Sequence, residues 1–145
     1  MPNIKDFMSQ DHKDCDEFFA QMEEAVAKKD NDIEAKFELF YDSLTNHFKM
    51  EEMVLFPMFE QKTGMANGPT QVMVMEHEQM RELLSRMEKA VEANDNDKFF
   101  GLSETLMILM QQHNMKEEQM LYTMAQQHLG DDAEHIISRM RAAAV

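Results

Sequence analysis

Apolar residues recur at spacings of three and four along most of the chain, with charged residues between them. This period is typical of amphipathic helices, which bury one stripe and expose the opposite face. Short polar or glycine-containing stretches interrupt the period near residues 30–32, 64–69 and 94–97, where one helix can end and the next be capped. The pattern predicts four long helices over residues 10–29, 32–63, 70–93 and 97–128, and a short fifth helix after Gly130.

Two irregular points are expected within this pattern. Pro57 lies inside the second predicted helix, and its ring removes one backbone donor and clashes with the preceding turn, so a bend is predicted around residues 53–57. Near the carboxyl end, Asp131 and Glu134 have the spacing of a capping box. Asp131 is therefore predicted to cap the fifth helix.

The two halves of the chain resemble each other, since residues 11–58 can be aligned with residues 76–124. His12, Met22, Ala25, Val26, Asp30, Asn31 and Asp32 have identical counterparts 65 residues later, and His47, Glu51, Glu52, Leu55 and Met58 have them 66 residues later. Each half thus contributes a helix pair. We predict a single all-α domain over residues 1–145, an internally duplicated four-helix bundle with up-down-up-down order and a short carboxyl-terminal helix.

Composition and charge narrow the classes of partner. Glycine (4) and proline (3) are scarce, as expected for a helical chain, and the formal net charge of −14 would repel nucleic acid and acidic membrane surfaces. Cys15 is the only cysteine, which excludes an intrachain disulfide and a thiolate-based metal site and fits a reducing compartment. Residues 1–9 lack the apolar core of a signal peptide, and no apolar run is long enough to span a bilayer. We expect a cytoplasmic protein, with a monomer as the default state.

Ionisable residues interrupt the apolar stripes at matching places. His47 and Glu51 share one face of the second predicted helix with Leu55 and Met58, and His113 and Glu117 repeat this arrangement in the fourth. His12 and His77 lie on the inward faces of the first and third. A buried carboxylate without a countercharge is costly, and the basic residue on a matching face, Arg81, cannot neutralise two glutamates and also explain four histidines. A pair of divalent cations can, so the predicted metal ligands are His12, His47, Glu51, His77, His113 and Glu117.

A single histidine on a helix face is more often a packed or surface residue than a ligand, and only the duplication outweighs that interpretation. His128 and His135 lie outside the repeated pattern and are expected to be exposed. Glu52 and Glu118 point about 100° away from the ligand glutamates, which favours surface positions or contacts to the ligands over ligation.

Four imidazoles and two carboxylates suit iron, and two glutamates that bridge two metals leave an open position on each. Zinc is usually bound by four ligands, whereas manganese remains a possible metal because it accepts the same nitrogen and oxygen atoms.

The 17 methionines could suggest copper, but Met22, Met58, Met87 and Met124 occupy helical spacings on inward stripes, so core packing is the better interpretation. Cys15 is expected to be a buried, inert thiol.

The segments HFKMEEMVLFPMFE (residues 47–60) and HNMKEEQMLY (113–122) resemble the second-helix and fourth-helix signatures of the hemerythrin-like family, the HHE cation-binding domains. Oxygen-carrying hemerythrins place another histidine where this chain has Arg81, and their fourth-helix carboxylate follows a His-x-x-x-x-Asp spacing. The resemblance is therefore closer to the di-iron proteins that repair iron-sulfur clusters after nitrosative or oxidative stress, which carry an additional amino-terminal domain.

These observations lead to one function with two alternatives. The first is a site of two iron ions (Fe2+/Fe3+, oxo- or hydroxo-bridged) whose diferrous form binds or reacts with O2, peroxide or NO. The alternatives are a module that stores, donates or senses iron without turnover, including cluster repair, and a purely structural metal site.

Asp16 and Arg81 lie one turn after His12 and His77, and we hypothesise that they form a salt bridge. The alternative is that Asp16 accepts a hydrogen bond beside the ligands or faces water.

Overall fold

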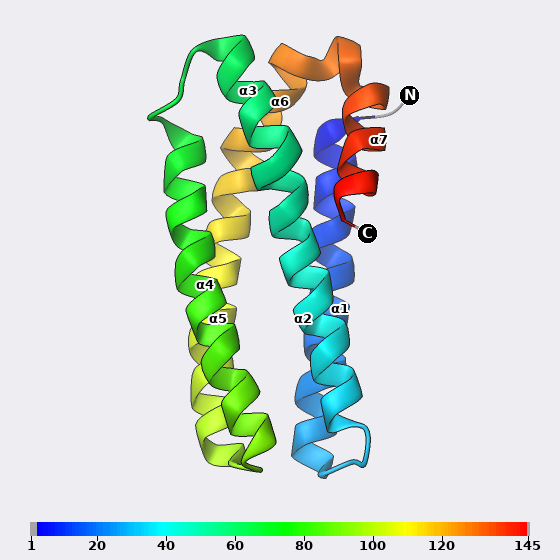
Figure 1. Cartoon of the computed structure of the whole chain (residues 1–145), viewed down its shortest axis with the longest axis vertical. Helices are drawn as coiled ribbons and strands as arrows, with labels where there is room; N and C mark the ends of the chain where they lie inside the picture. The colour runs from blue at the N-terminus through cyan, green and yellow to red at the C-terminus, as the bar shows by residue number, and fades with distance from the viewer. Residues whose placement is uncertain (1–2, 145) are drawn as a thin grey trace.

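Four long helical rods alternate in direction in the computed structural model, which describes residues 3–144; in the view of Figure 1 they run down, up, down and up. The predicted all-α bundle is confirmed. The first rod is α1 (Ile4–Lys28) and the third is α4 (Pro69–Glu92). The second rod consists of α2 (Ile33–Met50), a π-helical turn η1 (Glu51–Leu55) and α3 (Phe56–Thr63). The fourth consists of α5 (Asn96–Lys116), a second π-helical turn η2 (Glu117–Leu121) and α6 (Tyr122–Leu129).

The connections within the two halves end their helices in the same way. Lys29 and Asn94 occupy equivalent positions and both adopt the left-handed conformation, with φ of 54° and 55°. In each turn the following backbone amide donates to the carbonyl five residues back, over 3.0 Å in the first half and 2.9 Å in the second. This pairing satisfies carbonyls that the helix end leaves free. The duplication seen in the sequence is therefore present in the backbone.

The first helix begins six residues earlier than predicted. The side chain of Asn3 accepts a hydrogen bond from the amide of Asp6 at 3.0 Å, and the amide of Ile4 donates to Oε1 of Gln126 at 2.8 Å. Both bonds satisfy amide groups that an α-helix leaves unpaired at its start. Ile4 and Met8 are buried, so the added turns extend the core beyond the predicted helix.

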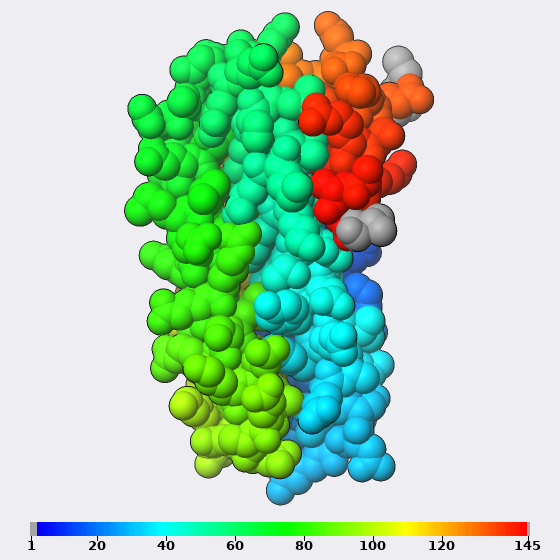
Figure 2. All heavy atoms as spheres, in the orientation of Figure 1, coloured from blue at the N-terminus to red at the C-terminus, as the bar shows by residue number. Residues whose placement is uncertain are grey.

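The chain beyond the bundle forms a 3-10 turn (Gly130–Asp132) and α7 (Ala133–Ala143). The predicted cap at Asp131 is wrong, because the helix is preceded by Asp132, whose side chain makes no capping hydrogen bond. α7 packs against α1, α2 and η1 through an apolar face that buries Ile136 and Met140. In the space-filling view, α7 lies beside α2, and the side chains of α2 and α4 meet along the face shown (Figure 2).

Both long irregular rods contain a π-helical turn at the same point of the repeat. The amide of Phe56 donates to the carbonyl of Glu51, and that of Tyr122 donates to the carbonyl of Glu117, which are i to i+5 bonds. The irregularity predicted around residues 53–57 takes this form, with Pro57 directly after it. The second turn has no proline and was not predicted. Single π-helical turns inside α-helices occur frequently at functional sites.

The bundle core is divided into two apolar clusters by a polar layer. One cluster includes Met8, Leu55 and Leu121 and is covered by α7, and the other includes Phe19 and Phe40 at the opposite end. Eight polar or charged residues of the described chain are buried, and six of them are the predicted ligands; the others are Thr70 and Ser103. Among residues 3–144, no helix combines the length and the apolar content that crossing a bilayer would require.

Candidate metal centre

The six predicted ligands come from all four rods and meet in one layer inside the bundle. Each is at most 4% exposed. Their potential ligand atoms fall into two groups, within each of which all atoms lie within 4.8 Å of one another. The first group contains Glu51, His77, His113 and Glu117, and the second contains His12, His47 and Glu117.

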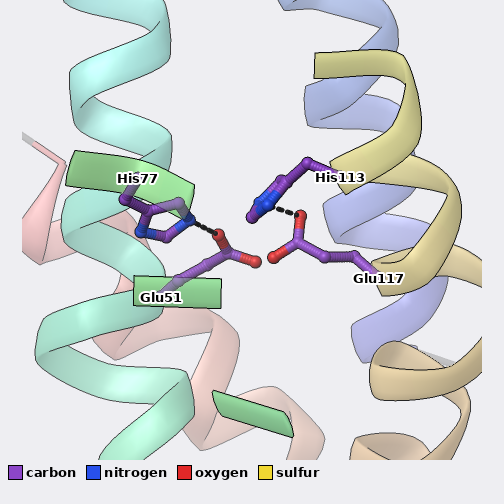
Figure 3. A group of neighbouring side chains, drawn as sticks. All are labelled: Glu51, His77, His113 and Glu117. Carbon is purple, nitrogen blue, oxygen red and sulfur yellow. Dashed lines mark ion pairs between the residues drawn. The ribbon is translucent and has the colours of Figure 1, made fainter. Parts of the chain in front are cut away.

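In the first group the imidazoles and carboxylates converge, and each imidazole forms an ion pair with one of the carboxylates (Figure 3). Nε2 of His77 lies 3.0 Å from Oε1 of Glu51, and Nε2 of His113 lies 3.3 Å from Oε1 of Glu117. Neither pair has hydrogen-bond geometry, and both ring nitrogens lack any hydrogen-bond partner, as do Oε1 of Glu51 and Oε2 of Glu117. Buried polar atoms are almost always hydrogen-bonded. Four unpaired atoms that face one another therefore indicate a position for a cation.

The two glutamates lie between the two groups of histidines. Oε1 of Glu117 is 3.0 Å from Nε2 of His12 and 3.8 Å from Nε2 of His47, in addition to its contact with His113. Oε1 of Glu51 is 3.5 Å from Nε2 of His47. Each carboxylate thus approaches histidines of both groups, which is the placement that a bridging carboxylate needs.

A second carboxylate holds the outer nitrogen of every histidine in the layer. An ionised carboxylate can only accept, so each Nδ1–H donates and leaves Nε2 free to face the centre. The four pairs are His12 with Glu118 (2.8 Å), His47 with Asp11 (2.6 Å), His77 with Glu52 (2.5 Å) and His113 with Glu76 (2.7 Å). Each such carboxylate belongs to a residue adjacent in sequence to a predicted ligand on a neighbouring rod.

These pairs decide a question that the sequence left open. Glu52 and Glu118 hydrogen-bond to the predicted ligands His77 and His12, so the second of the two expected roles, a contact to a predicted ligand, is the one observed. Asp11 and Glu76 were missed. A signal was available in the sequence, because an acidic residue directly precedes the first predicted ligand histidine in each half of the duplication.

Basic residues neutralise these outer carboxylates on one side of the layer. Arg81 donates to Glu52 at 2.8 Å and to Glu78 at 2.6 Å, and Lys116 pairs with Glu76. The hypothesised salt bridge between Asp16 and Arg81 is wrong, because both ends of the guanidinium are engaged by these glutamates. Within residues 3–144, neither Asp11 nor Glu118 pairs with a lysine or an arginine.

The ionisable groups of the layer shift one another's pKa values. Burial would lower the pKa of His77, but the nearby carboxylates of Glu51 and Glu52 more than offset it and raise the pKa to about 8. Burial would likewise raise the pKa of Glu117, yet hydrogen bonding with Glu51 and the charge of His113 hold it well below the usual range. Metal ligands must be deprotonated, so a divalent cation that binds here would displace any protons that these groups carry.

Tyr122 also contributes a polar group to the layer, and the sequence did not predict it. Its side chain is fully buried, and its hydroxyl oxygen lies 3.1 Å from Nε2 of both His12 and His47. The same oxygen is 2.7 Å from Oε2 of Glu51 and 2.9 Å from Oε1 of Glu117. The available signal was a break in the duplication, since the counterpart of Tyr122 in the first half is a phenylalanine.

Apolar side chains enclose the layer above and below. Phe48, Leu55, Met80 and Leu121 are all buried. The Phe48 ring stacks on the imidazole of His77 with centroids 4.0 Å apart, and the guanidinium of Arg81 lies 5.1 Å from the centroid of the same ring. Phe48 therefore contacts both the predicted ligand and the arginine that pairs with Glu52.

The remaining candidate residues are outside the two groups of potential ligand atoms. His128 and His135 are exposed, as predicted. Met22 and Met87 are fully buried in the apolar core, which confirms their packing role. Cys15 is 3% exposed, and burial raises the pKa of its thiol to about 12, so it has the properties of an inert buried cysteine.

Comparison with known proteins gives two findings. The family model of the hemerythrin HHE cation binding domain matches residues 3–125. A segment of 47 residues is 49% identical to the iron-sulfur cluster repair protein YtfE of Cronobacter sakazakii, and it covers 32% of this chain and 21% of that protein. No solved structure matches the chain significantly.

Proposed function

This chain belongs to the hemerythrin HHE cation-binding domain family, and on that basis we propose that it is a non-haem di-iron protein whose diferrous site binds or reacts with O2, peroxide or NO. The observation that carries the proposal is the set of four converging ligand atoms without hydrogen-bond partners. They belong to Glu51, His77, His113 and Glu117.

The residues present fit two metal ions. His77 and His113 would hold one ion and His12 and His47 the other, while Glu51 and Glu117 would reach both. Imidazole and carboxylate ligands in this ratio suit iron, and manganese offers the nearest alternative. Bound iron would supply electron transfer to or from a small molecule.

The chain's own residues contribute orientation, charge and water exclusion. The outer carboxylates fix each imidazole with Nε2 inward and make it a better donor to a cation. The ionised glutamates offset the charge of the metals. Apolar side chains on both sides of the layer, including Leu55 and Leu121, limit access of water. Reversible oxygen carriage is not part of the proposal, because Arg81 stands where oxygen carriers have a further histidine and is engaged by two glutamates.

A second candidate is an iron storage, donation or sensing module, including iron-sulfur cluster repair. It is supported by the local identity to a cluster repair protein, although the matched segment covers only 21% of that relative. The rate of iron loss to a chelator separates the two candidates. A donor should release iron rapidly to an acceptor, whereas a reactive site should retain it through cycles of reduction and oxidation.

The proposal is tested by metal analysis and optical spectroscopy of protein purified from iron-supplied cells. We expect about two irons per chain and a change in the visible spectrum when O2 or NO is added to the reduced protein. A single zinc, or no metal, would overturn the proposal. Unchanged spectra with both irons bound would favour a structural metal site.

We further propose a monomer in the reducing environment of the cytoplasm, because the buried thiol of Cys15 is the only sulfhydryl group of the chain. Cell fractionation and the mass of the purified protein in solution test these two points.

A further inference from the structure

We propose that Tyr122 is a ligand of the metal held by His12 and His47, so that the two metal positions are inequivalent and the small molecule binds at the His77–His113 position. This inference rests on the proposed di-iron function and specifies which of its two metals is open. It follows from the contacts of one hydroxyl oxygen and from the absence of that hydroxyl in the other half of the duplication.

The phenol oxygen of Tyr122 lies close to all three residues of the second ligand group. It lies 3.1 Å from Nε2 of His12 and 3.1 Å from Nε2 of His47. Metal ions hold such nitrogen and oxygen atoms at about 2.0 to 2.2 Å, so two ligands at right angles on one ion are separated by about 3 Å. The three atoms therefore already have the spacing of neighbouring ligands on a common metal.

The proton of the Tyr122 hydroxyl cannot satisfy all of its close contacts. The same oxygen is 2.7 Å from a carboxylate oxygen of Glu51 and 2.9 Å from one of Glu117. A hydroxyl group has one proton and can donate it to only one of them. A cation bound beside the phenol oxygen and the two carboxylates would make the other buried oxygen–oxygen contact favourable.

The matching position in the first half carries no hydroxyl. Phe56 is the counterpart of Tyr122, and its ring stacks near the imidazole of His77 with centroids 5.9 Å apart. Among residues 3–144, Nε2 of His77 and Nε2 of His113 have no hydrogen-bond partner, and they form ion-pair contacts with Glu51 and Glu117 respectively. The phenol would thus add a protein ligand at one metal position, and the other position would have one protein ligand fewer.

The charges around the two metal positions also differ. The carboxylates behind His77 and His113 are neutralised by Arg81 and Lys116, whereas those behind His12 and His47 have no lysine or arginine partner within residues 3–144. The second position is therefore the more negative one, which favours a ferric ion. When ferric iron binds there, an iron–oxygen bond replaces the O–H bond of Tyr122, and the proton leaves to solvent with the protons that the metal displaces from the other ligands. No electron is transferred in this step.

The test is the visible and resonance Raman spectrum of the ferric protein. A phenolate bound to Fe(III) gives a visible charge-transfer band, and excitation in that band enhances the vibrations of the bound tyrosine ring. We expect both features in the wild-type protein, with a frequency shift when the tyrosines carry a heavy isotope. Tyr122→Phe should lose both features while its iron content stays near that of the wild type.

The matched control is Tyr41→Phe, because Tyr41 is the only other tyrosine and packs against Phe37 in the apolar cluster away from the ligands. It should retain both features. A wild-type protein that holds both irons but lacks tyrosine vibrations would overturn the inference and leave the di-iron proposal standing, and this measurement does not depend on the folding of any variant. A wild-type protein without iron would overturn the di-iron proposal itself.

Discussion

Oε2 of Glu118 accepts a hydrogen bond from Nδ1 of His12 at 2.8 Å, across 106 residues of sequence, and Glu52 does the same for His77 in the other half of the duplication. Each of these glutamates directly follows a predicted ligand glutamate, so the two adjacent acidic residues have different roles. The first faces the predicted metal position, and the second orients a histidine on the neighbouring rod.

Removal of the outer carboxylate should weaken metal binding without removing a ligand. We expect Glu118→Gln to lower iron affinity by about 10- to 100-fold, because the imidazole of His12 loses its orienting charge. Competition against a chelator of known affinity measures the change. Glu24→Gln, at an exposed position on α1, is the control and should bind iron as the wild type does. Equal affinities for all three proteins would show that this contact is irrelevant to the metal.

Substitution of a bridging glutamate should have a larger effect. Glu51→Ala removes the fully buried carboxylate that lies between His47 and His77, so both metal positions lose a ligand. We expect the purified variant to contain little iron and to lack the spectral response to O2 or NO. Elemental analysis gives the result directly. The exposed Glu104→Gln on α5 should keep the full iron content.

Metal removal should destabilise the fold, because a cation that binds only the native state adds to the free energy of unfolding. At a free metal concentration about 100 times the Kd, the contribution is about 2.7 kcal/mol, which corresponds to roughly 5 to 11 °C in Tm for a domain of this size. Thermal unfolding before and after chelation, followed by helical circular dichroism, measures it. A Tm independent of metal would contradict binding in the buried layer.

Cys15 should be unreactive in the native protein. Burial raises the pKa of its thiol to about 12, so the reactive thiolate is scarce at every pH below that value. We expect very slow alkylation between about pH 7 and 9 in the folded protein and rapid alkylation after denaturation. The chain has one cysteine, so the mass increase reports on this residue alone. Fast labelling of the folded protein would mean that α1 opens locally near His12.

Loss of the Tyr122 hydroxyl should open a second position to external ligands. In Tyr122→Phe we expect more NO to bind per di-iron centre than in the wild type, because the metal held by His12 and His47 loses one protein ligand. Titration of the diferrous proteins with NO, followed by electron paramagnetic resonance, compares the two. Equal uptake would indicate that the hydroxyl does not restrict access.

The helical pattern and the duplication were sufficient to predict the four rods and the six residues that converge in the layer. Both predictions depend on periodicity within one helix, which places His47 and Glu51, or His113 and Glu117, on a common face regardless of what packs there. The start of α1 was less predictable, because its first amides are satisfied by the side chain of Asn3 and by Gln126 from a distant part of the chain.

Tyr122 was missed for a geometric reason. In a regular α-helix, a residue five positions after Glu117 would point about 140° away from it. The π-helical turn brings the i+5 residue back toward the same side, so the Tyr122 hydroxyl meets the carboxylate of Glu117 at 2.9 Å. No proline marks this turn in the sequence, and only the break in the duplication at this position hinted at it.

The sequence by itself determined which residues each helix buries, and therefore that four histidines and two glutamates would share a core. Only the tertiary structure decided their partners: Glu118 with His12, and Arg81 with Glu52 instead of Asp16. The physical reason is that periodicity fixes the direction of a side chain around its own helix axis, whereas a contact between helices also depends on how far each helix is rotated and shifted along its neighbour.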